Sequence, residues 1–178
     1  MSKTISIIVP CFNEQESVPL FYAAVEKVAA QLPDHAIEYL FINDGSADQT
    51  LPAMRTLQAQ DPEHVHYISF SRNFGKEAAL YAGLQAATGD YVAVMDVDLQ
   101  DPPALLPEMI QGIEVEGYDC VGTRRTTRAG EPPVRSFFAK KFYQIINHIS
   151  QTKIVDGARD YRLMTRQMVD AILEMTEY

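Results

Sequence analysis

Residues 94–101, Val-Met-Asp-Val-Asp-Leu-Gln-Asp, carry the side chains best suited to bind a metal ion. Alternate residues of a strand point to one side, so Asp96, Asp98 and Gln100 can present three oxygens to one spot where the strand runs into its loop. Hard oxygen ligands suit Mg²⁺ or Mn²⁺, which in turn bind diphosphate oxygens. A bare Asp-x-Asp pair can also merely solvate a strand end, but an apolar strand before it and a helix after it favour a metal site.

Three further polar segments contain candidate ligand-binding residues. Asp44 lies in an Asn-Asp-Gly-Ser turn, where glycine permits the tight geometry that aims the carboxylate at a ligand, although these residue types are also ordinary turn formers. Glu14 can accept a hydrogen bond from a base or a ribose, or can be a first-turn acid that suits a helix dipole. Arg72 and Lys76 lie at a predicted helix N-terminus, where cations are unfavourable unless an anionic ligand binds beside them. A solvated Arg and Lys is the alternative.

The elements that position these segments follow from the hydrophobic pattern. Strands are predicted at residues 5–9, 37–42, 65–70 and 91–95. Apolar residues spaced by three and four predict one helix from Val18 to Leu32 and another from Leu105 to Ile113, with Asp101 as the cap of the second. Apolar strands separated by helices predict an α/β fold with a mostly parallel sheet and helices on both faces. Ligands bind at the carboxyl ends of such strands, where all the polar segments lie.

The composition limits the classes of function. The 178 residues are enough for one domain, taken as 1–178, and the formal net charge of -9 argues against nonspecific nucleic-acid binding. Cys11 and Cys120 are far apart and form no Cys-x-x-Cys pair, so a reducing, cytosolic setting fits best. No run of about 18 apolar residues occurs, so nothing in this sequence is expected to span a bilayer.

Basic residues are concentrated in one segment, 124–141, which has six of them against a single acid. The segment is either a solvated loop and helix face or an anion site on an otherwise acidic protein. From Arg135 to Ile149, apolar residues recur near a period of 3.6 beside basic ones, which predicts a basic amphipathic helix. Packing of this helix on its own sheet is the simpler interpretation, and contact with an anionic membrane surface is the alternative.

Five motifs occur in order along the chain. They are Pro-Cys-Phe-Asn-Glu at 10–14, Asn-Asp-Gly-Ser at 43–46, Ser-Arg-Asn-Phe-Gly-Lys at 71–76, Met-Asp-Val-Asp-Leu-Gln-Asp-Pro-Pro at 95–103 and Gly-Ala-Arg-Asp-Tyr-Arg-Leu-Met at 157–164. Together they resemble family 2 glycosyltransferases, which have the Rossmann-like GT-A fold. Within that family the resemblance points to the polyprenyl-phosphate sugar transferases, such as dolichol-phosphate mannose synthases and bactoprenol glucosyltransferases. One departure is Asn43, where the family commonly has Asp.

The resemblance implies roles for individual residues. The nucleotide would contact Pro10, Glu14, Asp44, Lys76 and Asp96. The metal, Mg²⁺ or Mn²⁺, would be held by Asp96, Asp98 and Gln100. Asp160 matches the acid that family members place beside the acceptor, and Arg162 could have a structural role, paired with it. The acceptor phosphate would meet Arg124, Arg128 and Arg135, because guanidinium groups bind phosphate oxygens at two points.

The expected reaction is a metal-dependent, inverting transfer of a sugar from a nucleotide-sugar, such as UDP-glucose or GDP-mannose, to a polyprenyl phosphate. Alternatives are transfer to a saccharide hydroxyl in cell-envelope polysaccharide synthesis, and a domain that binds nucleotide-sugars without transferring them. Asp160 would position the acceptor or, with a hydroxyl acceptor, act as a general base. By the same resemblance the full-length enzyme would continue beyond this chain and attach to the cytoplasmic face of a membrane. A homo-oligomer of the full-length form is a further expectation. No Gly-x-Gly-x-x-Gly follows the first strand, which argues against a nicotinamide-dependent dehydrogenase.

Overall fold

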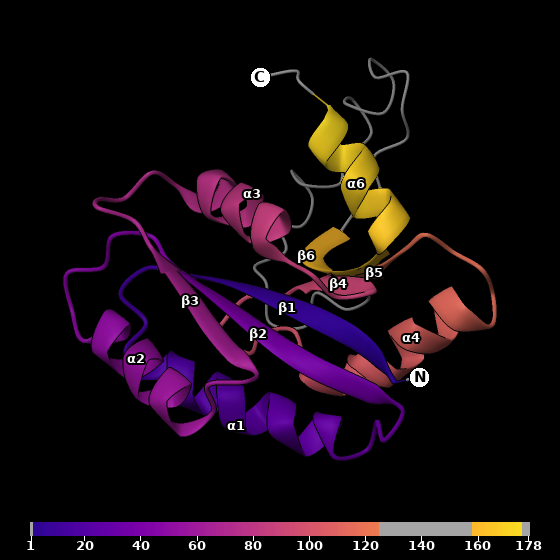
Figure 1. Cartoon of the computed structure of the whole chain (residues 1–178), viewed down its shortest axis with the longest axis horizontal. Coiled ribbons are helices and arrows are strands. Elements are labelled where there is room, and N and C mark those ends of the chain that lie inside the picture. Colours follow the sequence, from indigo (N-terminus) through magenta and orange to yellow (C-terminus); the bar gives the residue numbers. More distant parts are fainter. Residues whose placement is uncertain (1, 125–157, 176–178) are drawn as a thin grey trace, which may run out of the picture.

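The computed structural model describes residues 2–124 and 158–175, and within them six strands form one sheet in the order β3-β2-β1-β4-β6-β5 (Figure 1). The strands are β1 (Lys3–Cys11), β2 (His35–Asn43), β3 (Val65–Ser69), β4 (Tyr91–Val94), β5 (Cys120–Arg124) and β6 (Ala158–Thr165). The helices are α1 (Ser17–Ala29), α2 (Thr50–Gln60), α3 (Lys76–Ala86), α4 (Leu106–Glu114) and α6 (Arg166–Glu174), with a short 3-10 helix, η1 (Pro103–Leu105), before α4.

The sheet is mostly parallel, as the sequence predicts. β1 pairs in parallel with β2 and β4, and β2 pairs in parallel with β3. β6 is the exception, because it lies antiparallel between β4 and β5. The carboxyl ends of β1, β2, β3 and β4 therefore lie along the same edge, and the antiparallel β6 begins at that edge with Asp160 near its start.

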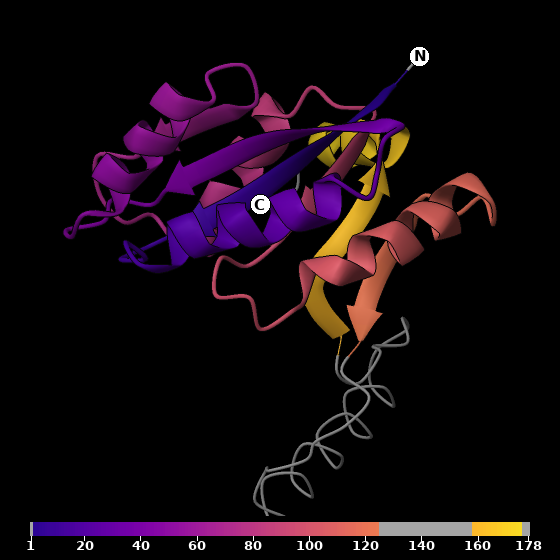
Figure 2. The same ribbon diagram turned by 90° about the horizontal axis from the view of Figure 1, so that it is seen from below.

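Helices cover both faces of the sheet (Figure 1). On one face α1, α2 and α4 pack through residues such as Phe21, Met54 and Leu106, and α1 and α4 lie in front of the strands when the molecule is seen from below (Figure 2). On the other face α3 and α6 pack on a second cluster that includes Ile8. Gly83 permits the close approach of α3, because a Cβ atom there would lie 2.3 Å from Cγ2 of Ile8. Both faces of β1, β2 and β4 are thus largely buried, which explains why these strands are mostly apolar.

One predicted helix start is wrong. Asp101 does not cap the helix, because Pro102 is extended and the first turn begins at Pro103 with no side-chain cap. The restricted backbone at a residue that precedes proline disfavours a helical start there. The Asp101 carboxylate instead lies 3.6 Å from Nε of Arg159 on β6.

The predictions that concern lipid and membrane rest largely on the segment 125–157. Arg128, Arg135 and the helix expected from Arg135 to Ile149 lie outside the described residues. Arg124 is described and is the exposed last residue of β5. None of the helices in the described part of the chain is long and apolar enough to cross a membrane.

Two loops at the carboxyl edge of the sheet pack backbone to backbone. Gly45, in the turn after β2, has a φ of +67°, and a Cβ atom there would lie 2.2 Å from the carbonyl carbon of Arg72. The turn after β2 and the loop after β3 can therefore lie against each other only if residue 45 has no side chain.

We expect Gly45→Ala to lower the free energy of unfolding by about 2 to 4 kcal/mol, because it adds both a left-handed backbone penalty and a clash with the neighbouring backbone. Urea denaturation measures the loss. Gly117→Ala is the matched control, since Gly117 has a φ of +76° but nothing within 4 Å of the added methyl; its cost should be about 1 kcal/mol. Equal losses for the two variants would contradict the tight packing of the two loops.

Candidate active site

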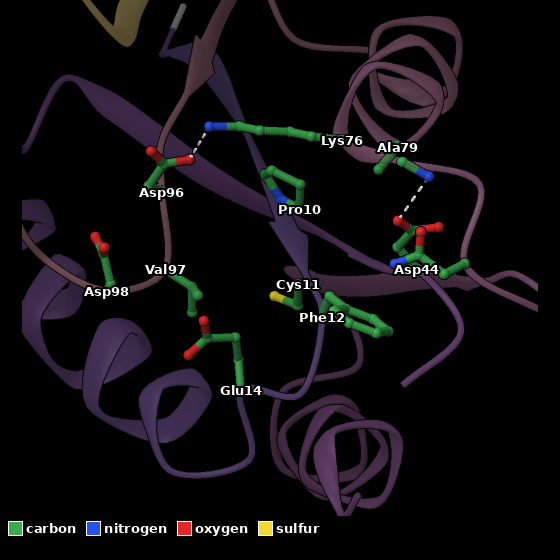
Figure 3. A pocket seen from close by; sticks show the side chains of 12 residues that line it. Pro10, Cys11, Phe12, Glu14, Asp44, Lys76, Ala79, Asp96, Val97 and Asp98 are labelled. Atoms are coloured by element: carbon green, nitrogen blue, oxygen red, sulfur yellow. Dashed lines mark hydrogen bonds and ion pairs between the residues drawn. The ribbon is translucent and has the colours of Figure 1, made fainter. Parts of the chain in front are cut away.

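A pocket of about 470 Å³ lies at the carboxyl edge of the sheet (Figure 3). It is lined by Pro10, Cys11, Phe12, Glu14, Asp44, Asn73, Gly75, Lys76, Ala79, Asp96, Val97 and Asp98. These residues come from the ends of β1, β2 and β4, from the loop before α3 and from the first turns of α3. The structure thus gathers the predicted nucleotide-binding residues Pro10, Glu14, Asp44, Lys76 and Asp96 in one pocket.

Asp44 joins the loop before α3 to the end of β1. Its carboxylate is almost fully buried and accepts hydrogen bonds from the backbone N–H groups of Phe74 at 2.7 Å and Gly75 at 3.0 Å. Its own N–H donates to the carbonyl of Cys11 at 2.9 Å. A carboxylate has about four acceptor positions, so Asp44 can hold the loop before α3 and still accept a bond from a ligand in the pocket.

Asn43, the departure from the family pattern, uses both ends of its side-chain amide. Its Nδ2 donates to Oγ of Ser69 at 2.9 Å, and its Oδ1 accepts from the N–H of Ser46 at 3.1 Å. The side chain is buried, and its hydrogen-bond partners are the end of β3 and the turn itself, so both ends of the amide are used within the protein. A neutral amide therefore meets the local requirement without placing a charge in the protein interior.

Glu14 and Cys11 lie on the β1 side of the pocket. The Glu14 Oε2 accepts from Oγ of Ser17 at 2.6 Å, and the Glu14 N–H donates to Oγ1 of Thr50 at 2.7 Å. Glu14 therefore helps to start α1 and also borders the pocket, so the two interpretations of this residue are compatible. The Cys11 thiol is buried and donates to the carbonyl of Val9 at 3.4 Å, and burial raises its pKa. A thiol held protonated in this way is no nucleophile at neutral pH.

The predicted metal ligands lie on a loop and not on the strand. β4 ends at Val94, and Leu99 has a φ of +59°, so the chain turns between Asp98 and Gln100. The alternation of side chains along a strand does not apply here, which corrects the geometric argument for three oxygens on one side. Asp96 and Asp98 border the pocket, whereas Gln100 is not among its lining residues and donates its N–H to Oδ1 of Asp98 at 3.1 Å.

Two pocket carboxylates suit a metal ion that arrives with a diphosphate. Among the described residues, no three His, Cys, Asp or Glu side chains are placed to hold a metal by themselves. Mg²⁺ is commonly bound by only one or two carboxylates, with substrate phosphates and water completing the shell. Asp98 is exposed and Asp96 partly exposed, so both carboxylates are accessible to an ion that they share with a diphosphate. The donor set of Asp96 and Asp98 fits Mg²⁺ or Mn²⁺ in the presence of a nucleotide.

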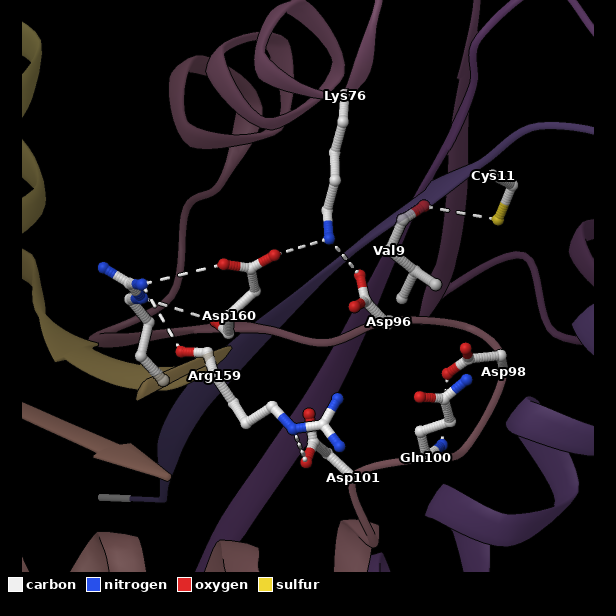
Figure 4. Close-up of polar contacts among 10 residues, drawn as sticks. Val9, Cys11, Lys76, Asp96, Asp98, Gln100, Asp101, Arg159 and Asp160 are labelled. Carbon is white, nitrogen blue, oxygen red and sulfur yellow. Dashed lines mark hydrogen bonds and ion pairs between the residues drawn. The ribbon is translucent and has the colours of Figure 1, made fainter. Parts of the chain in front are cut away.

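Lys76 connects the loop after β4 to Asp160 on β6 (Figure 4). Its Nζ lies 2.6 Å from Oδ1 of Asp96 and 2.7 Å from Oδ2 of Asp160. The hydrogen bond from Lys76 lowers the pKa of Asp160, with partial burial opposing it. Burial lowers the pKa of Lys76, but its bonds to Asp160 and Asp96 outweigh that effect and leave the pKa raised. Asp160 is therefore an anion at neutral pH, and Lys76 a cation.

Three arginines lie near this site, and one of them, Arg162, shares Asp160 with Lys76. Nε of Arg159 lies 3.6 Å from Asp101, whose pKa is raised by burial although Arg159 lowers it. Arg162 NH2 lies 3.9 Å from Oδ1 of Asp160, as the structural role for Arg162 implies. Arg72 lies over the ring of Phe74, 4.5 Å from its centroid, and does not border the pocket. Of the cationic pair in the third motif, only Lys76 faces the site.

Sequence reasoning missed two features of the site. Phe12 borders the pocket and leaves 48% of its surface exposed, which gives the pocket an aromatic wall. Its position in the motif at residues 10–14, directly after the first strand, could have indicated that Phe12 borders the pocket. The second feature is the contact of Lys76 with Asp96 and Asp160. Lys76 and Asp160 are 84 positions apart in the sequence, so no local pattern predicts their contact.

Comparisons with known proteins give this site a context. The model of the family described as glycosyl transferase family 2 matches residues 6–173. The prophage bactoprenol glucosyl transferase homolog of Escherichia coli K12 is 43% identical over 97% of this chain and 56% of its own length. This chain thus spans about half the length of that curated relative.

Solved structures share the fold. A mannosyltransferase from Pyrobaculum calidifontis, in complex with GDP-mannose and Mn²⁺, has a TM-score of 0.63 at 20% identity over 97% of this chain and 47% of its own. Glucosyl-3-phosphoglycerate synthase from Mycobacterium tuberculosis, with Mn²⁺, UDP-glucose and phosphoglyceric acid, has a TM-score of 0.63 at 18% identity over 93% of this chain and 57% of its own. The predicted GT-A fold is confirmed.

Proposed function

Because this chain belongs to glycosyl transferase family 2, we propose that it is the catalytic domain of an enzyme that moves a sugar from a nucleotide-sugar to a polyprenyl phosphate. The observation that carries the proposal is the pocket at the carboxyl edge of the sheet that is lined by Asp96 and Asp98 together with Asp44 and Glu14. It combines acceptors for a nucleoside with carboxylates for a metal and diphosphate.

The donor and acceptor are inferred from the relatives. The E. coli relative is named a bactoprenol glucosyl transferase homolog, which makes UDP-glucose and undecaprenyl phosphate the first pair to test. GDP-mannose is the second donor, because the Pyrobaculum mannosyltransferase was solved with it. Asp44 can accept from a base or a ribose hydroxyl in either nucleotide, so it does not distinguish the two.

A divalent ion bound at Asp96 and Asp98 would neutralise charge on the departing nucleoside diphosphate. Both solved structures described above contain Mn²⁺, so Mn²⁺ is the first ion to test. Lys76 borders the same part of the pocket and supplies a further positive charge for the leaving group. A metal ion held by Asp96 and Asp98, together with the Lys76 ammonium, would thus supply positive charge on the side where negative charge develops.

The transfer is proposed as a single displacement with inversion. An oxygen of the acceptor phosphate forms a bond to the anomeric carbon while the bond from that carbon to the nucleoside diphosphate breaks. A phosphate monoester has a second pKa of about 6, so it is already an anion at neutral pH and needs no base. Asp160, itself an anion paired with Lys76, then orients groups in the site and does not remove a proton.

Two other proposals follow from the expected acceptor. A polyprenyl phosphate is a membrane lipid, so the enzyme would act at the cytoplasmic face of a membrane, and Arg124, with Arg128 and Arg135, would bind the lipid phosphate. Transfer to a saccharide hydroxyl remains the second candidate function. It is favoured only by the presence of Asp160 beside the pocket cation, since a hydroxyl acceptor requires a general base.

The reaction can be tested with the purified full-length protein, UDP-glucose or GDP-mannose, undecaprenyl phosphate and Mn²⁺, with the lipid-linked sugar detected by mass spectrometry. We expect transfer from one donor, loss of transfer with a chelator and recovery with Mn²⁺. Asp98→Asn should reduce turnover by about 100-fold or more, because it weakens the charge-stabilising clamp. Asp34→Asn, an exposed acid in the turn before β2, should leave turnover unchanged. Undiminished transfer in the presence of chelator, or binding of neither donor, would contradict the proposal.

Asp160→Asn separates orientation from proton removal. With the lipid phosphate acceptor we expect a loss of about 10- to 100-fold that is constant between pH 6.5 and 8.5, since no proton is abstracted; loss of a general base typically costs about 100- to 10,000-fold. Steady-state kinetics across that pH range provide the measurement. Asp170→Asn on α6 is the surface control. A loss that varies with pH would assign Asp160 a base role, and full turnover would remove it from the catalytic residues.

A further inference from the structure

The Lys76 ammonium occupies a position that matters for metal binding. Lys76 is the first residue of α3. Its Nζ lies within 2.7 Å of one oxygen of Asp96, in the loop after β4, and of one oxygen of Asp160, on β6 (Figure 4). Asp96 is also one of the two pocket carboxylates that fit a divalent ion. The protein's own cation therefore already holds an oxygen that the metal would use.

The carboxylates of this region differ in their counter-ions. Asp101 is near Arg159, and Asp160 is near both Lys76 and Arg162. Asp98 has no ion-pair partner in residues 2–124 and 158–175. Asp96 has Lys76. A divalent ion that approaches the pocket alone thus meets Asp96, whose charge is already offset by an ammonium, and Asp98, which has no ion-pair partner in that described part of the chain.

α3 packs on the sheet through apolar contacts that do not involve Lys76. The contact of α3 with the sheet is made by Ala79 and Gly83, which pack against the cluster around Ile8. The Lys76 side chain is 38% exposed and borders the pocket. Its removal should therefore change the charge of the site more than the fold.

We propose that Lys76 is the resident counter-ion of the metal site, which suppresses binding of a free divalent cation and makes metal and nucleotide diphosphate bind together. In the ligand-free protein its charge neutralises Asp96 and repels a metal ion. When the diphosphate enters with the metal, it supplies the negative charge that offsets both cations. The inference rests on the proposed function, since it assumes that Asp96 and Asp98 are the metal-binding carboxylates.

This arrangement has a thermodynamic consequence. If Lys76 disfavours the metal alone but not the metal with a diphosphate, then the nucleotide must raise the affinity for metal, and the metal must raise the affinity for nucleotide by the same factor. Removal of the ammonium should reduce that coupling. The site would then bind metal without a nucleotide, which the wild-type protein avoids.

The test is Mn²⁺ binding, followed by electron paramagnetic resonance of the free ion, with and without UDP. We expect Lys76→Met to bind Mn²⁺ alone about tenfold more tightly than the wild type, the size of effect expected for one screened unit charge beside the site. UDP should tighten Mn²⁺ binding by a smaller factor in Lys76→Met than in the wild type. Lys76→Arg keeps the charge and should resemble the wild type, and Lys27→Met, an exposed lysine in the last turn of α1, should have no effect.

The outcomes separate this inference from the proposed function. Mn²⁺ affinity without UDP that is unchanged or weaker in Lys76→Met, including no detectable binding in either protein, would overturn the role of Lys76. Failure of the wild-type protein to bind Mn²⁺ in the presence of UDP would instead count against the proposed function. Tighter binding of Mn²⁺ alone by Lys76→Met, with wild-type behaviour in Lys76→Arg, supports the counter-ion role.

Discussion

The Lys76 ammonium lies between the carboxylates of Asp96 and Asp160, and this contact addresses the main electrostatic constraint on the site. Several acids converge on one edge of the sheet in a protein whose formal net charge is already -9. Like charges at short range are unfavourable, so such a cluster needs cations of its own or a bound metal. Lys76 and Arg159 supply the first kind of compensation, and a metal at Asp96 and Asp98 would supply the second.

The position of Lys76 depends in turn on Asp44. The buried Asp44 carboxylate binds the N–H groups of Phe74 and Gly75, the two residues directly before α3. Gly45 lets the backbone of that loop lie against the turn after β2. The turn after β2 therefore also sets where α3 begins and where the side chain of its first residue lies. A substitution of Asp44 should therefore shift Lys76 and weaken its contact with Asp96.

Much of the scaffold could be predicted from local patterns. Strands β1 to β4, the stripe of apolar residues in α1 and helix α4 follow from hydrophobic period and length, whereas β5 and β6 were not predicted. Parallel strands also place their carboxyl ends together. The side-chain geometry could not be predicted in the same way. A left-handed backbone at Leu99 turns the loop after β4. Because Pro102 is extended, Asp101 does not cap a helix and its carboxylate lies near Arg159. The contact between Asp101 and Arg159 joins the loop after β4 to β6, which is distant in the sequence.

The central claim is that Asp96 and Asp98 bind a divalent ion that also binds the diphosphate of the donor. Anomalous diffraction from crystals grown with Mn²⁺ and UDP tests it most directly. The account predicts a manganese peak within coordination distance of both carboxylates and of diphosphate oxygens. A structure with UDP in the pocket, Asp98 directed into solvent and no ion beside it would contradict the account.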